Sequence, residues 1–160
     1  SLIKLTSEIT VNPSFSTIIE KTFMADANNT GRVVIVAATS PSDIPPSGIF
    51  EFATFTIDAN TTYSNFVSDI YFDAFDSQIV DELGPQLPAT YTNALITVNP
   101  VSQISPTSAV ITPTPVTEVQ VYFDPTSASV PPATNMRVMM NYFNGTGGVA
   151  FARVVFNFDT

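Results

Sequence analysis

The sequence predicts an all-β protein, and three observations carry this prediction. It is rich in Phe (13) and Tyr (5), which favour strands, as do its many Val, Ile and Thr residues. Its 13 prolines are scattered along 160 residues, which argues against long helices. No apolar stripe with helical spacing persists along the chain. We therefore expect a β-sandwich in which no helix exceeds about two turns.

The first 98 residues contain short apolar segments separated by turn residues. Residues 1–11 have strand character from the start, and 26–31 (DANNTG) predict a turn because Asn and Gly tolerate positive φ. Arg32–Ala38 (RVVIVAA) is apolar on both faces, as expected of a central, covered strand. The remaining expected elements of this part are strands at 49–57, 68–75 and 92–98, and one helical turn at 79–83.

The segment 99–117 interrupts this pattern. Four prolines (Pro100, Pro106, Pro113 and Pro115), together with Ser and Thr, indicate an extended linker. A surface loop is the alternative, but unstructured loops of this length are uncommon inside compact domains. Because proline lacks the N–H group that a ladder requires, we expect no regular pairing over most of the segment.

A second β block follows at 118–160. Residues 118–124 alternate cleanly between apolar and polar, 135–143 form the next strand, and 144–148 (NGTGG) its hairpin turn. The last strand, at 149–158, then runs to the end of the sequence.

The end of the sequence leads into its beginning. Joined, the two ends read VVFNFDT–SLIKLTSEI, which is a strand, a turn and another strand. We therefore expect residues 1–98 to carry the later strands of the sandwich and 118–160 the first three. The 118–160 block is expected to be donated to the 1–98 block of the next copy, in a head-to-tail fibre. The alternative is that both blocks pack within one chain.

In the order 117–160 followed by 1–98, the chain resembles a cohesin-like module of cell-surface and cellulosome scaffolds. VQVYFDPTSASVPPATNMRVMMNYFN resembles the opening strand, the P-x-S-x-x-V segment and the second strand. GGVAFARVVFNFDT–SLIKLTSEI resembles the third strand and its corner, although the usual proline is missing. The later strands follow in family order. The resemblance implies a nine-stranded jelly-roll-like β-sandwich with an extracellular role. No dockerin-binding residue is carried over.

Composition excludes several functions. With five basic residues and a net charge of −9, the chain lacks the basic cluster that nucleic acid requires. It has no His or Cys, which removes the commonest general base, thiol nucleophile and transition-metal ligands. The sequence contains no run of 18 apolar residues, so it predicts no membrane-spanning segment. We predict no enzyme activity, no cofactor and no metal site.

Three carboxylates in SDIYFDAFD (Asp69, Asp73 and Asp76) are the candidates for chemistry. A carboxylate pair would suit glycoside hydrolysis, and oxygen ligands would suit calcium. A solvated polar face is the favoured interpretation.

Two sets of surface residues complete the prediction. Glycosylation sequons begin at Asn28, Asn60 and Asn144, all in expected turns. Apolar side chains opposite the core at Met139, Phe143, Phe151 and Val155 predict a subunit contact, with ordinary scatter of apolar residues over the surface as the alternative.

The expected function is that of a structural subunit or repeat of an extracellular filament or cell-surface fibre that polymerises by β-strand donation. Its partners would be other copies of itself. The alternative is a cohesin-like binding module that recognises a dockerin-like partner or a carbohydrate.

Overall fold

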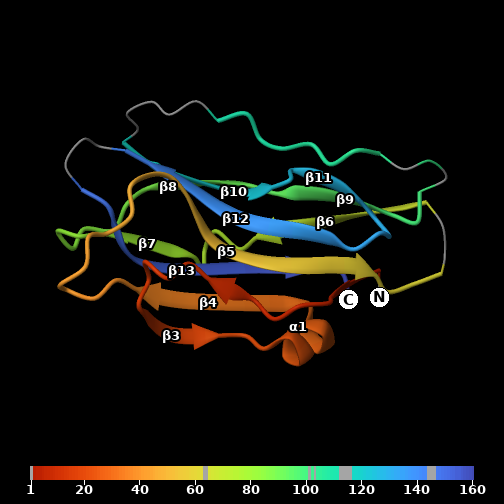
Figure 1. Cartoon of the computed structure of the whole chain (residues 1–160), viewed down its shortest axis with the longest axis horizontal. Helices are drawn as coiled ribbons and strands as arrows, with labels where there is room; N and C mark the ends of the chain where they lie inside the picture. Colours follow the sequence, from red (N-terminus) through yellow and green to blue (C-terminus); the bar gives the residue numbers. More distant parts are fainter. Residues whose placement is uncertain (1, 63–64, 101, 103, 112–116, 144–146) are drawn as a thin grey trace.

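A computed structural model describes residues 2–62, 65–100, 102, 104–111, 117–143 and 147–160. Its strands form two sheets that pack face to face, which confirms the predicted all-β sandwich (Figure 1). The strands are β1 (Ile3–Leu5), β2 (Thr10–Val11), β3 (Thr17–Lys21), β4 (Arg32–Ala38), β5 (Gly48–Ala59), β6 (Phe66–Phe72), β7 (Gln78–Asp81), β8 (Ala89–Thr92), β9 (Ala94–Val98), β10 (Val119–Asp124), β11 (Ser127–Val130), β12 (Thr134–Tyr142) and β13 (Val149–Phe158). Within the described residues the only helix is α1 (Met24–Thr30), which respects the predicted limit of two turns.

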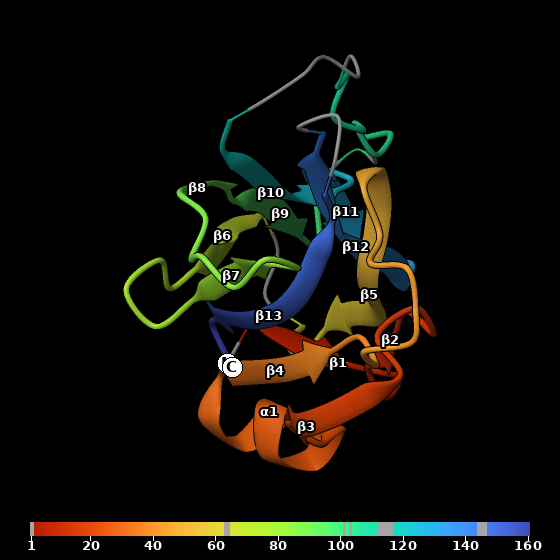
Figure 2. The same cartoon turned by 90° about the vertical axis from the view of Figure 1, so that its left-hand side faces the viewer.

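Each sheet combines strands from both parts of the chain. The first sheet has the order β1-β5-β12-β10-β8, and β2 also pairs with β5. The second has the order β11-β9-β6-β13-β4-β3, and β7 also pairs with β13. Most neighbours are antiparallel, whereas β10–β8 and β11–β9 are parallel pairs. Viewed from its end, the molecule shows the two sheets enclosing a single core (Figure 2).

Two stacked pairs of aromatic rings join the sheets. Phe55 and Phe123 come from the first sheet, and Phe72 and Phe156 from the second. The Phe72 and Phe123 rings stack with centroids 4.2 Å apart, and those of Phe55 and Phe156 with centroids 5.1 Å apart. Offset aromatic stacking adds to the free energy gained by burying these rings.

The isolated chain closes its own sandwich. Strand β13 pairs with β4, β6 and β7 of the same chain, and β12 pairs with β5. The prediction that a neighbouring copy completes the sandwich is therefore wrong for the single chain. Residues 99–117, called the strap from here on, are long enough to connect β9 in one sheet to β10 in the other, so the two blocks of one chain can pack together.

The strap behaves as its prolines predict where the structure describes it. Residues 104–111 run along the outside of the sandwich (Figure 1). Their one ladder contact is an isolated bridge between Thr107 and Ser127, and the Ile104 N–H donates to the Ser129 hydroxyl. For the described residues, the predicted lack of regular pairing is confirmed.

The two chain ends meet at one end of the sandwich. The N–H groups of Leu2 and Ile3 both donate to the carbonyl of Asp159, at 3.2 and 2.9 Å. Figure 1 shows the N and C labels side by side. The sequence continuity between the last and first strands is thus matched by their closeness in space.

Two local predictions are wrong. The expected turn at 26–31 is mostly helix α1, because Ala27 is buried and the Asn28 side chain bonds both the N–H and the carbonyl of Leu5, at 2.7 and 2.9 Å. The expected helical turn at 79–83 begins as strand β7, because Ile79 enters the core beside β13. Contacts with residues distant in the sequence override weak local preference in both segments.

Candidate functional site

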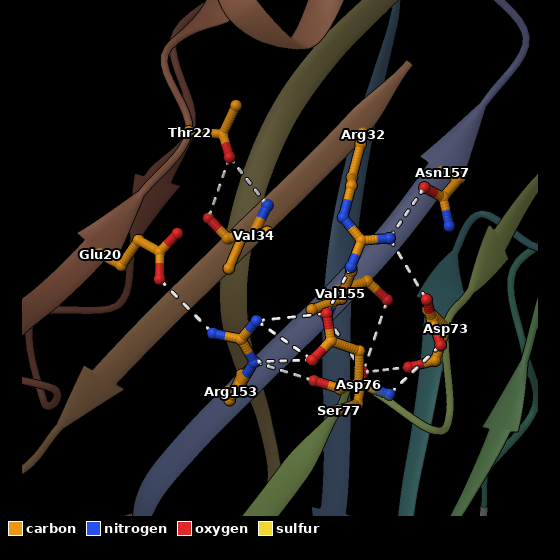
Figure 3. A network of polar contacts seen from close by, with 10 residues as sticks. All are labelled: Glu20, Thr22, Arg32, Val34, Asp73, Asp76, Ser77, Arg153, Val155 and Asn157. Atoms are coloured by element: carbon orange, nitrogen blue, oxygen red, sulfur yellow. Dashed lines mark hydrogen bonds and ion pairs between the residues drawn. The ribbon is translucent and has the colours of Figure 1, made fainter. Parts of the chain in front are cut away.

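Two of the candidate carboxylates, Asp73 and Asp76, lie in a segment that is bonded to β13. Residues 73–77 connect β6 to β7 and lie beside Val155, which is fully buried (Figure 3). The Asp73 N–H donates to the Val155 carbonyl at 2.8 Å, and the Val155 N–H donates to the Ser77 hydroxyl at 3.0 Å. These backbone contacts hold Asp73 and Asp76 above the sheet.

Two arginines from neighbouring strands converge on Asp76. Arg153, on β13, donates from Nη2 to both carboxylate oxygens at 3.1 and 3.2 Å. Arg32, at the start of β4, forms an ion pair with Asp76 and a second one with Asp73 at 3.2 Å. Glu20 on β3 extends the network to Arg153 at 3.4 Å (Figure 3). The network of Glu20, Arg32, Asp73, Asp76 and Arg153, called the arginine clamp below, links strands β3, β4 and β13 to the 73–77 segment.

The charged groups of the arginine clamp pair with one another. The hydrogen bond from Arg153 lowers the pKa of Asp76, and burial opposes this only in part. The same bond raises the pKa of Arg153. Both groups are therefore charged at neutral pH and neutralise one another. A general acid would need the opposite shift, a pKa raised towards neutrality.

The arrangement does not favour calcium either. Asp73 and Asp76 face guanidinium groups, which compete with a cation for the same oxygens. The third candidate, Asp69, is exposed on β6 outside the clamp. Among the residues that the structure describes, no group of three or more acidic side chains could hold a metal ion.

The arginine clamp predicts a pH-dependent contribution to stability. Because the folded pKa of Asp76 lies below its unfolded value, its contribution is present at neutral pH and is lost as the pH falls through the folded pKa. We expect Asp76→Asn to lower the free energy of unfolding at pH 7 and to flatten its decline between pH 5 and pH 2, as measured by urea unfolding at each pH.

Asp69→Asn is the control for this prediction, because it removes an exposed carboxylate from the same sheet without touching the clamp. It should leave the acid dependence close to that of the unaltered chain. Equal profiles for the two variants would show that the clamp contributes nothing.

The predicted subunit-contact residues do not form one surface. Val155 is fully buried, so its assignment as a contact is wrong. Met139 lies on the first sheet and Phe151 on the second, and both are half-buried. Phe143 is 43% exposed beyond the end of β12. The back-folding of 73–77 could not be read from the strand pattern.

The three sequons also differ. The Asn28 side-chain amide is engaged by Leu5, so modifying it would break that hydrogen bond in the folded chain. Asn60 is exposed just after β5. Asn144 lies outside the described residues.

A second site, not predicted from the sequence, lies among the loops at the end opposite the chain termini. Two hollows of about 480 and 200 Å³ share Pro45 and Glu82 in their walls. Beside them, Ile44 and Leu83 are 91% and 83% exposed. The only sequence signal was the presence of these large apolar residues within Pro- and Gly-containing loops. We call Ile44, Pro45, Glu82, Leu83 and Phe143 the loop-end patch.

Within the described part of the chain, no helix combines the length and apolar character needed to cross a membrane. Comparison with protein-family models, curated proteins and solved structures found no match to this chain.

Proposed function

We propose that the chain is a structural subunit or repeat of an extracellular filament or cell-surface fibre. The observation that carries the proposal is the arginine clamp, in which the candidate carboxylates Asp73 and Asp76 bind arginines that tie three strands to a covering segment. Side chains that would otherwise be available for chemistry are thus used to brace a sheet. A high net negative charge suits a protein surrounded by solvent.

The finer description of the fold belongs to the same proposal. We assign the sandwich to the nine-stranded, jelly-roll-like arrangement of cohesin-like modules. The order of sequence motifs supports this, and so does the meeting of Asp159 with Leu2 and Ile3, because the family corner in the resemblance would join the same two segments. Donation of strands between separate chains is left out of the proposal, because the single chain pairs β13 with its own β4.

Immunogold electron microscopy of the cells that produce the protein tests the function. Antibodies against the purified chain should label fibres or filaments outside the cell. Label confined to the cell interior would contradict the proposal, and so would a diffuse secreted protein with no fibre.

The loop-end patch favours a second candidate, a binding module for a dockerin-like partner or a carbohydrate. Its exposed Leu83 and Ile44 beside two hollows provide apolar contact area, and Glu82 provides a polar group. A glycan array and a dockerin-like helical module are the probes. Binding that is lost in Leu83→Ser and kept in Val110→Ser, a change of an apolar residue on the strap that is at least as exposed, would support this candidate.

A further inference from the structure

We propose that, where copies of this chain follow one another in one polypeptide, each sandwich is completed across the junction. The 118–160 block of the preceding copy would occupy the place that the chain's own block takes in the single chain. The partner is therefore a second copy of this chain. The inference rests on the proposed function as a repeat and adds how consecutive repeats connect.

The first observation is the meeting of the chain ends. The Asp159 carbonyl accepts hydrogen bonds from both Leu2 and Ile3, and Ile3 in turn pairs with Ala59 in β5. The Phe158 N–H donates to the Gly31 carbonyl at 2.8 Å, which fixes the end of β13 beside α1. A polypeptide passing from β13 of one copy into β1 of the next has to make only a turn.

The second observation is the length of the competing connection. The chain's own 118–160 block is reached only through the strap of 19 residues between Val98 and Glu118. The described strap residues 104–111 run along the length of the sandwich, away from the end where the termini meet (Figure 1). Closing the sandwich through the strap therefore closes a much longer loop than closing it through the junction.

Loop length decides between the two closures, because the paired residues are the same in both. The entropic cost of closing a loop grows as (3/2)RT times the logarithm of its length. A closing turn of about four residues is therefore favoured about tenfold over a loop of about 19 residues. The strap stays attached at Val98 in either case.

Junction closure also produces an elongated array. The strap would leave each sandwich near the end where β9 finishes and would enter the next one at the opposite end, where β10 begins (Figure 1). Entry and exit at opposite ends give consecutive sandwiches in line, as a fibre requires.

A chain with residues 118–160 duplicated directly before Ser1 tests this inference, because its single 1–98 block must choose between two equal partners. The natural chain has no cysteine, so engineered pairs report the choice. Ala38 and Phe151 are opposite one another in β4 and β13. We would combine Ala38→Cys with Phe151→Cys in one of the two 118–160 blocks, either the duplicated one before Ser1 (the leading block) or the chain's own block. Disulfide formation at equilibrium is then measured for each variant.

We expect the leading-block variant to form the disulfide about ten times more than the own-block variant. Equal yields, or a preference for the chain's own block, would overturn the inference. In the duplicated chain one 118–160 block stays unpaired and can aggregate. A rearranged chain, 118–160 followed by 1–117, keeps all 160 residues and has no unpaired block. It should be a folded monomer that unfolds at the same urea concentration as the natural chain or higher. If it fails to fold, the inference is wrong, whereas labelling of fibres on cells still decides the proposed function separately.

Discussion

Replacing Phe123 by Ala should lower the free energy of unfolding by about 3–5 kcal/mol, the range measured for large aromatic residues removed from protein cores. The Phe123 ring is fully buried, stacks on Phe72 at 4.2 Å and meets Phe156 edge-on at 5.4 Å. The substitution leaves a cavity between the sheets that rigid strands cannot fill. Because domains of this kind are stable by about 5–15 kcal/mol, much of the total would be lost.

Phe75→Ala is the matched control, since this phenylalanine is fully exposed in the segment between β6 and β7. Its effect should stay within about 0.5 kcal/mol, as for most surface changes. Guanidinium unfolding followed by far-ultraviolet circular dichroism measures both. Comparable losses for the two variants would show that the aromatic cluster does not hold the sheets together.

The strands that the sequence predicts best are those with a clear apolar pattern of their own. Arg32–Ala38 and Val149–Phe158 have the expected bounds. Their continuous or alternating apolar side chains are buried only when the segment lies as a strand within a sheet. The short strands β3, β8 and β11 were missed. β8 and β11 owe their pairing to parallel neighbours far along the chain, which carry no local signal.

The candidate site was predictable in part. The sequence singled out Asp69, Asp73 and Asp76 by their spacing, and the structure places two of them together above β13. Their arginine partners could not be predicted, because Arg153 lies 77 residues from Asp76 and only the folded sheet brings them together. The loop-end patch was missed for the same reason, since three separate connections build it.

The second large effect is expected at Gly31, where helix α1 ends against the last strand. Gly31 has φ +70°, and a β-carbon built on it would lie 2.5 Å from the Phe158 carbonyl oxygen. Gly31→Ala therefore combines a left-handed backbone, which costs about 1–2 kcal/mol for an L-residue, with a clash against backbone that cannot rotate away. We expect a loss of more than about 2 kcal/mol in the free energy of unfolding.

Gly84→Ala separates the two causes of this loss. Gly84 also has a positive φ, +96°, but a β-carbon there would meet no atom within 4 Å. It should therefore show the backbone cost without the clash, and urea unfolding of both variants measures the difference. If Gly31→Ala costs no more than Gly84→Ala, the end of β13 can move away from α1. The meeting of Asp159 with Leu2 and Ile3 would then be too loose to guide a chain from one copy into the next.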